Sequence, residues 1–187
     1  MEEQFWKACW RGDIEEIRKL LENPHININW QNNGLTPLYG ACCWGYIEIV
    51  KLLLNDKRVD INKMMKNGTT PLWLACSKGH LEIVELLLAS KWEVNIDAKD
   101  NNKGQNAKDI AKEEGKKEKK QWECEEDLQR RMRNCPKIVE LLESFERNPT
   151  EIKFKLRKQF GLLGFFLFFS FFFLFFFLFF FLFFSFQ

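Results

Sequence analysis

The residues best suited to chemistry are a cysteine and a histidine, Cys76 and His80, which lie four positions apart. On one helix this spacing would place a thiol beside an imidazole, the pair that many cysteine nucleophiles use. Gly79 stands between them, and glycine commonly ends a helix, so the two side chains are not expected to form such a pair. No Gly-rich phosphate loop, nucleophile elbow or H-E-x-x-H motif occurs either. We therefore predict a protein that is not an enzyme and uses no cofactor or small-molecule substrate.

The cysteines and histidines also lack the spacing of a metal site. Six cysteines occur without a C-x-x-C pair, and His25 and His80 are the only histidines, so no zinc site is expected. Cys9, Cys42 and Cys76 each follow an alanine and recur at a regular interval, which indicates reduced thiols in a buried small-residue position. This usage fits a reducing, cytosol-facing compartment. The formal net charge of +2 gives no field that would favour nucleic acid as a partner.

These cysteines belong to a repeat of 34 residues. The stretch from Asn33 to Asn67 returns from Asn67 to Asn95, and a fixed period of this length is typical of a solenoid. The recurring positions are a turn glycine, a proline, an alanine, a second glycine and a leucine. They are Gly34 and Gly68, Pro37 and Pro71, Ala41 and Ala75, Gly45 and Gly79, and Leu54 and Leu88.

Each unit has the pattern of a tight turn followed by two short helices. Asn33 and Gly34 both tolerate positive φ and favour the turn. Thr36 can cap a helix that has Pro37 at its first position, and Gly45 can end that helix. The second helix carries one apolar stripe, which only stacked copies of the unit can bury. The stripe is Ile47, Val50, Leu53 and Leu54 in one unit, and Leu81, Val84, Leu87 and Leu88 in the next.

The units resemble ankyrin repeats, whose signature is a β-turn, the motif T-P-L-H-x-A and two antiparallel helices. The match is carried by Thr36-Pro37-Leu38, by Thr70-Pro71-Leu72, and by the Glu-Ile-Val-x-Leu-Leu-Leu runs that begin at Glu48 and Glu82. The resemblance implies an all-α, ankyrin-type helix–turn–helix solenoid with short β-turn fingers. It also implies a scaffold or adaptor that binds another protein.

One position departs from the ankyrin motif. The resemblance implies a histidine that forms hydrogen bonds between repeats, but this chain has Trp6, Tyr39 and Trp73 there. We expect the three rings to replace those hydrogen bonds by packing as an aromatic ladder.

The resemblance covers residues 1–148, and its last unit is irregular. A charged insertion near 116–135 separates the two helices of that unit, and Pro136 is expected to start the second one. The insertion is either a solvated helical excursion or a helix that docks a partner. Lys108 stands where other units have leucine, which predicts an open or distorted edge. The units are expected at about 1–32, 33–66, 67–100 and 101–148.

Beyond residue 148 the chain is expected to leave the solenoid. Residues 149–161 form a basic segment, in which Thr150 can cap a short helix. Residues 162–186 carry no charge and are almost all Phe or Leu. As a helix they would span ~37 Å, more than the ~30 Å hydrocarbon core of a bilayer. This predicts a C-terminal hydrophobic helix that anchors the protein in a membrane by a single pass, with the repeats facing the cytosol.

The tail has a second interpretation. Phe, Leu and Ser are the residues that a thymine-rich nucleotide tract encodes, so the alternative is that the segment is a low-complexity or gene-model artefact. The chain would then be a cytoplasmic ankyrin binding module without a membrane partner.

The partner surface is expected on the positions that the ankyrin resemblance implies to face outward. Large apolar residues at such positions are suited to be interface anchors. Some of the same side chains could instead pack against a neighbouring finger. The predicted partner-binding residues are Trp10, Arg11, Gly40, Cys43, Trp44, Leu74, Ser77 and Lys78 on the short helices, and Trp30, Met64 and Met65 on the fingers.

Overall fold

The computed structural model describes residues 1–119 and 123–162. Within these residues the chain forms nine α-helices and no β-strand, and Asn32 and Leu35 make an isolated antiparallel bridge. The all-α prediction is therefore confirmed for the described part of the chain. The helices are α1 (Glu2–Arg11), α2 (Ile14–Leu21), α3 (Pro37–Trp44), α4 (Ile47–Asn55), α5 (Pro71–Lys78), α6 (Leu81–Ala89), α7 (Ala107–Glu114), α8 (Glu125–Arg147) and α9 (Pro149–Gln159).

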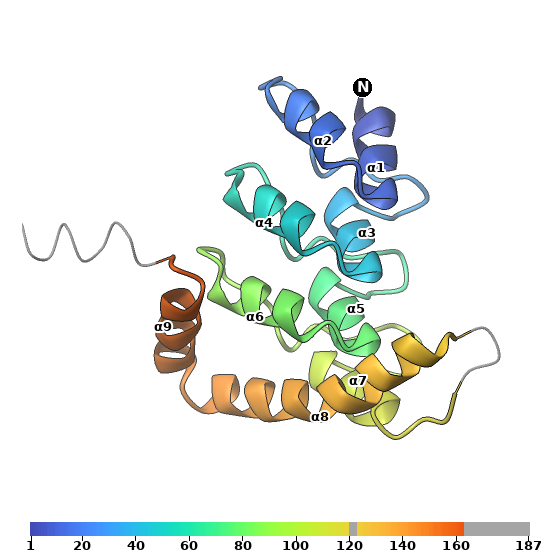
Figure 1. Ribbon diagram of the computed structural model, residues 1–187, viewed down its shortest axis with the longest axis vertical. Helices are drawn as coiled ribbons and strands as arrows, with labels where there is room; N and C mark the ends of the chain where they lie inside the picture. Colours follow the sequence, from blue (N-terminus) through green and yellow to red (C-terminus); the bar gives the residue numbers. More distant parts are fainter. Residues whose placement is uncertain (120–122, 163–187) are drawn as a thin grey trace, which may run out of the picture.

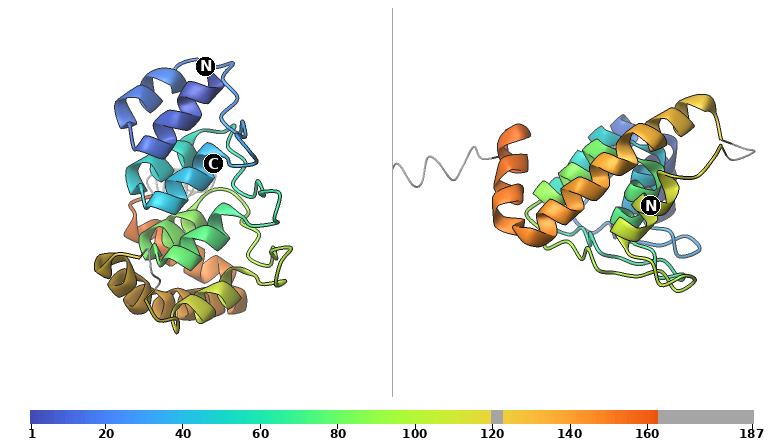
Figure 2. Two further views of the ribbon diagram at one scale, coloured as in Figure 1. Left: turned by 90° about the vertical axis from the view of Figure 1, so that its right-hand side faces the viewer. Right: turned by 90° about the horizontal axis from the view of Figure 1, so that it is seen from below.

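The helices stack in two rows (Figure 1). The inner row is α1, α3, α5 and α7, in which each helix contacts the next, and the outer row is α2, α4 and α6. The long helix α8 closes one end of the stack against α5, α6 and α7, and α9 turns back along α6. The connections between units project as fingers from one side of the stack (Figure 2).

The caps of the repeated helices follow the predicted pattern. The hydroxyl of Thr36 accepts a hydrogen bond from the Tyr39 N–H at 3.1 Å, and Thr70 accepts one from Trp73 at 3.2 Å. Each bond satisfies a backbone donor that the first helical turn would otherwise leave unpaired. Gly45 ends α3 at φ 79°, a left-handed conformation that glycine adopts without strain. These local rules explain why the unit can repeat with one geometry.

The apolar stripe of the outer helices forms the shared core. Val50, Leu53, Val84 and Leu87 have no exposed surface. Burying each such side chain contributes about 1.5–3 kcal/mol, and α4 alone could not cover its own stripe. The recurring small-residue position is also buried, because Cys9, Cys42 and Cys76 are fully enclosed free thiols.

The predicted aromatic ladder is wrong in its geometry. Trp6 donates its indole N–H to the Leu35 carbonyl at 2.9 Å, and Trp73 donates to the Gln105 carbonyl at 3.1 Å. These residues therefore connect successive units by hydrogen bonds to backbone, whereas we expected packing of rings. The indole N–H can reach a backbone carbonyl of the next unit because it lies at the far end of a large side chain.

The fourth unit is closed, which corrects the expected open edge. Lys108 Nζ lies 2.5 Å from Glu146 Oε2, so an ion pair between α7 and α8 covers the position. Pro136 does not start a helix, because α8 continues through it. Arg131 and Cys135 before the proline and Ile138 after it are buried on one face. The burial of that face outweighs the ~3 kcal/mol that an internal proline costs.

The basic segment 149–161 also differs from its prediction. Asn148, rather than Thr150, caps α9 by accepting a hydrogen bond from the Glu151 N–H at 3.2 Å. The chain does not leave the solenoid at Pro149, because α9 packs on α6 and α8 and buries Leu156. Two of its cations serve this contact.

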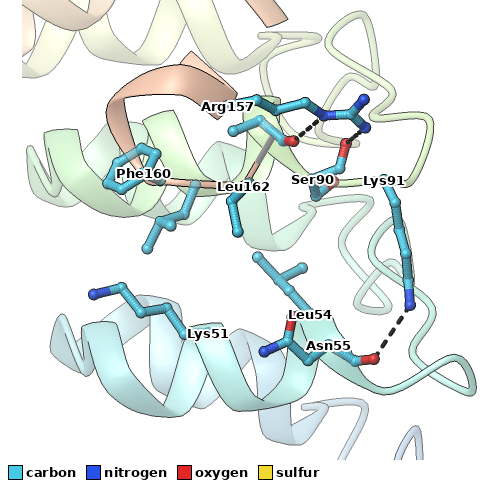
Figure 3. Close-up of a pocket in the computed structure, with 10 residues that line it drawn as sticks. Lys51, Leu54, Asn55, Ser90, Lys91, Arg157, Phe160 and Leu162 are labelled. Atoms are coloured by element: carbon cyan, nitrogen blue, oxygen red, sulfur yellow. Dashed lines mark hydrogen bonds between the residues drawn. The ribbon is translucent and has the colours of Figure 1, made fainter. Parts of the chain in front are cut away.

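Arg157 binds the end of α6 (Figure 3), and Lys153 binds the loop that follows it. Arg157 donates to the carbonyls of Ala89 at 2.9 Å and Ser90 at 3.0 Å, and Lys153 donates to the Trp92 carbonyl at 3.0 Å. The C-terminal carbonyls of a helix lack backbone partners and carry partial negative charge, so cations are favoured there. These two cations hold α9 in place and are not a free basic flank.

An apolar groove of about 380 Å³ lies between α4, α6 and the end of α9 (Figure 3). Leu54, Leu86, Phe160 and Leu162 line it, and Leu162 is the last residue that the structure describes. The predicted anchor therefore falls outside the described residues, apart from Leu162. Among the residues that are described, no helix combines the length and apolar character that a membrane span requires.

Candidate functional site

A pocket of about 320 Å³ opens beside the inner helices α3 and α5 and is closed on its far side by α8. It brings together four of the predicted partner-binding residues and five residues that were not predicted. The predicted ones are Cys43, Trp44, Ser77 and Lys78, and the others are His80, Glu123, Asp127, Arg130 and Arg131.

Trp44 stands at this pocket with 56% of its surface exposed. Its ring meets the ring of Trp10 edge-on, with centroids 6.5 Å apart and planes at 79°. Trp10 in turn stacks on Trp6 with centroids 5.0 Å apart. Edge-to-face and offset-stacked contacts are favourable ring geometries. The exposed indole is thus supported by two further rings, and a supported side chain loses less entropy on binding.

Gly40 allows this arrangement. A side chain at Gly40 would collide with the indole of Trp10, so the close approach of the ring requires glycine. Gly40 is buried as a result, and Leu74 is only 7% exposed. The predicted outward orientation is therefore wrong for these two residues, and Trp10 of α1 covers Gly40.

The far wall of the pocket is built around Arg131, which is 2% exposed. Its guanidinium donates to both carboxylate oxygens of Glu123 at 2.9 Å. It also donates to the backbone carbonyls of Glu114, of Lys117 at 3.2 Å and of Glu118 at 3.3 Å. A buried charge is tolerated when it is paired and its donors are satisfied. One arginine thus connects α8 to the segment that follows α7.

The same part of α8 binds the end of α5. Asn134 donates to the Gly79 carbonyl at 2.9 Å, and Arg130 donates to the Lys78 carbonyl at 3.3 Å. A side chain at Gly79 would approach the backbone of Arg131 within 2.9 Å, so glycine allows the close contact. One face of residues 123–135 is therefore docked on the repeats of the same chain, while the other face, with Glu126, Gln129 and Arg133, stays exposed to solvent.

Ionic contacts inside the pocket neutralise most of its charge. Arg130 lies 2.6 Å from Asp127. A hydrogen bond from Cys124, together with Arg130, lowers the pKa of Asp127 against the opposing effect of burial. Three cations and two carboxylates line the pocket, and Glu114 pairs with Arg131 at 3.8 Å from behind the wall. The lining cations are Lys78, Arg130 and Arg131, and the lining carboxylates are Glu123 and Asp127.

His80 is a neutral member of the pocket. Burial, followed by the nearby charge of Arg130, lowers its pKa to about 4, so the imidazole is uncharged at neutral pH. Its Nε2 lies 3.3 Å from the Cys43 carbonyl, which fits a tautomer with the proton on Nε2. Cys76 is fully buried, and burial raises its thiol pKa well above the ordinary value. The imidazole therefore contacts the preceding unit, and the thiol stays protonated.

The remaining predicted partner-binding residues lie outside the pocket. Arg11 is exposed at the end of α1, and Met64 is 44% exposed on a finger. Trp30 and Met65 are half-buried among the fingers. Within the described residues, no group of three or more His, Cys, Asp or Glu side chains is placed to hold a metal ion.

An asparagine relay at the base of the fingers was not predicted. Asn29 donates to the Arg58 carbonyl at 2.7 Å and accepts from the Asp60 N–H at 2.8 Å. Asn62 repeats this one unit later, with the Glu93 carbonyl at 2.8 Å and the Asn95 N–H at 2.9 Å. The signal in the sequence was the recurrence of asparagine at 29, 62 and 95. Each amide fixes one finger against the next.

Two family models match the chain in the region of these units. Residues 5–65 match the model described as ankyrin repeats (3 copies), and residues 67–101 match the model described as ankyrin repeat. The matched residues include most of α1, all of α2 to α6 and the inner-row part of the pocket, while α8 lies beyond them. The chain belongs to the ankyrin repeat family.

Proposed function

We propose that this ankyrin repeat protein is a non-enzymatic adaptor that binds another protein on its inner-row face. This Trp44 face, as we call it, comprises Trp10, Trp44, Ser77 and Lys78 together with the pocket wall of α8. The observation that carries the proposal is Trp44, a large indole more than half exposed and supported by two other rings. Aromatic side chains next to arginine and lysine are the usual anchors of protein interfaces.

The expected contribution of this anchor is large enough to measure. Truncation of an aromatic anchor typically weakens binding by about 2 kcal/mol or more, which is roughly a 30-fold change in Kd. Fold stability should change little, because more than half of the Trp44 side chain already faces water.

The test uses the full chain with a photo-crosslinking amino acid in place of Arg11, which is exposed at the edge of the face. Crosslinked proteins are identified by mass spectrometry and compared between Trp44→Ala and a matched control, Phe154→Ala. Phe154 is 54% exposed and lies on α9, away from the inner row. We expect Trp44→Ala to abolish the crosslinks and Phe154→Ala to preserve them. Equal crosslinking in both variants would remove the proposed face.

The membrane tether is a separate proposal that rests on the sequence of residues 162–186 alone. Their uncharged Phe- and Leu-rich composition favours it, and the low-complexity interpretation of the same residues is the alternative. Carbonate extraction of the full chain, with mass spectrometry of its C-terminal peptide, distinguishes them. Retention in the membrane pellet with the peptide present supports the tether, and release into the supernatant rejects it. The binding function does not depend on this outcome.

A further inference from the structure

A second surface of the molecule suits a ligand, and it lies on the outer row, away from the Trp44 face. It is the apolar groove between α4, α6 and the end of α9. Its volume of about 380 Å³ is within the range of pockets that bind ligands. Leu54 of α4 and Leu86 of α6 line it together with Phe160 and Leu162, which follow α9 (Figure 3). The wall is therefore shared between the regular units and the end of the described chain.

The cations at the groove are engaged within the chain. Lys51 lies 2.8 Å from Glu48, and Lys91 donates to the Asn55 carbonyl at 3.2 Å. Arg157 binds the carbonyls at the end of α6. Among the described residues that line the groove, none is acidic. An uncharged apolar occupant would leave these contacts in place, whereas a charged one would have to compete with them.

The backbone turns sharply where α9 meets the groove. Gly161 has a φ of 67°, the left-handed conformation that glycine adopts without strain. The Leu162 N–H donates to the Arg157 carbonyl at 2.8 Å, and the Gly161 N–H donates to the Lys158 carbonyl at 3.2 Å. These two bonds around a left-handed glycine form a Schellman motif, which ends a helix. Helix α9 therefore stops before Leu162, and Leu162 becomes part of the groove wall.

The residues that follow Leu162 have the chemistry that the groove favours. Residues 163–187 contain no charged side chain, and the first four of them, residues 163–166, are Leu, Gly, Phe and Phe. An extended chain spans at most about 3.6 Å per residue, so these four residues reach roughly 14 Å from Leu162. Covalent attachment beside the groove gives them a high effective concentration there. Burial would also remove two phenylalanine rings from water.

We propose that the groove between α4, α6 and α9 is a docking site for residues 163–166 of the same chain. The inference goes beyond the proposed function and does not depend on the Trp44 face. A membrane span that uses all of residues 162–186 excludes this docking, because the same residues cannot occupy the groove and the bilayer together. The groove and a bilayer therefore compete for the start of the Phe-rich segment.

The test places a photo-crosslinking amino acid at Asn55, an exposed residue of the groove, in the full chain. The substitution keeps the backbone carbonyl that Lys91 binds. The chain is synthesised in a cell-free system without detergent or vesicles, and crosslinks are mapped by mass spectrometry. We expect position 55 to crosslink to residues 163–166. The same amino acid at Lys19, exposed on α2, is the matched control and should not crosslink to them.

The absence of this crosslink at position 55, or an equal yield at both positions, would overturn the proposal. Chains of natural and heavy isotope content are mixed in the same experiment. Crosslinks confined to single isotope species support docking within one chain. Crosslinks between the two species would assign the groove to the segment of a second copy and contradict the proposal.

Two variants of the segment distinguish a specific site from general adhesion of an apolar chain. Phe165→Asp places a charge inside the docked residues, and Phe177→Asp places the same charge further along the chain. We expect Phe165→Asp to lower the crosslink yield from position 55 by about tenfold, because it removes a buried ring and adds a charge. Phe177→Asp should leave the yield unchanged. Equal yields in the two variants would show general adhesion and overturn the site.

A final arm tests the competition with a bilayer. The chain with the crosslinker at Asn55 is synthesised with phosphatidylcholine vesicles, and the fraction that carbonate does not extract is collected. We expect this fraction to lack the crosslink to residues 163–166, while chains left in the supernatant keep it. A crosslink that persists in the vesicle-inserted fraction would contradict the competition.

Discussion

The two regular units, α3 to α6, and the fourth unit, α7 with α8, bury similar helical hairpins by different means. The regular units use aliphatic stripes, threonine caps and glycine ends, all of which recur at one period. The fourth unit joins the same apolar core through Ile138 and Leu142. It adds ion pairs, which are Lys108 with Glu146, Lys112 with Glu143 at 3.1 Å, and those of the buried Arg131. Apolar contacts are non-directional, so the same contacts can form in every repeat. In a buried charge network, the loss of one partner leaves the other charge uncompensated. The fourth unit therefore gains a specific surface and depends more on single residues.

The strongest test of this difference is Arg131→Met. It leaves Glu123 and Glu114 buried without their guanidinium partner, so we expect a loss of about 3–5 kcal/mol in the free energy of unfolding of the C-terminal part. Hydrogen exchange should accelerate in α7 and α8 and stay unchanged in α1 to α4. Uniform acceleration along the whole stack would show that the two regions are not separately stabilised.

The matching change in the regular units is Leu87→Ala. Leu87 is fully buried in α6, and removing three carbons from a packed core costs about 2–5 kcal/mol. Urea unfolding should show this loss together with faster hydrogen exchange in α4 and α6. A loss below ~1 kcal/mol would mean that the shared aliphatic core is not what holds these units together.

The next prediction concerns the pH dependence of stability at His80, which lies where the regular units meet α8. The pKa of His80 is about 4 in the folded protein and near 6.5 in the unfolded chain, so the unfolded state binds a proton first as the pH falls. The contribution of neutral His80 to the free energy of unfolding is therefore fully present above pH 6.5. It is lost between pH 6.5 and pH 4, which lowers the free energy of unfolding by about 2–3 kcal/mol. Urea titrations at several pH values should show that His80→Gln has a smaller loss over this range. An equal loss in this variant would assign the effect to other groups.

The smallest expected effect is at the end of α9. Arg157→Ala removes two hydrogen bonds to the end of α6 from a partly exposed site and should cost about 1–2 kcal/mol. Lys155→Ala is the control, because Lys155 pairs with Glu151 on the surface and should contribute less than ~0.5 kcal/mol. Thermal unfolding of both variants measures the difference. Equal effects would show that Arg157 does not fix α9.

The sequence predicts the regular units well because their signals are local and periodic. Thr36, Pro37 and Gly45 specify their own backbone through caps and allowed φ values, and the stripe at Leu53 follows the helical period. The path of the chain after α7 could not be predicted in this way. Proline ordinarily marks a boundary, and Pro136 lies inside α8 only because tertiary packing on both of its sides outweighs that local preference.

The candidate site shows the same limit. Trp44 followed from the repeat register, since an outward position can be read from its place in the unit. The burial of Gly40 and the pocket contributions of His80 and Arg130 could not be read in that way. The burial of Gly40 depends on the ring of Trp10 from α1. The pocket contributions of His80 and Arg130 depend on the N-terminal half of α8, which occurs once and leaves no periodic signal. Charged side chains such as Arg131 are also expected on the surface from composition alone.

The most direct test of the account is the affinity of the crosslinked partner, purified and titrated against the full chain by calorimetry. The account predicts that Trp44→Ala weakens this affinity by roughly 30-fold, while Phe154→Ala leaves it unchanged. A partner that binds Trp44→Ala as tightly as the unaltered chain would contradict the claim that the inner-row face is the binding surface.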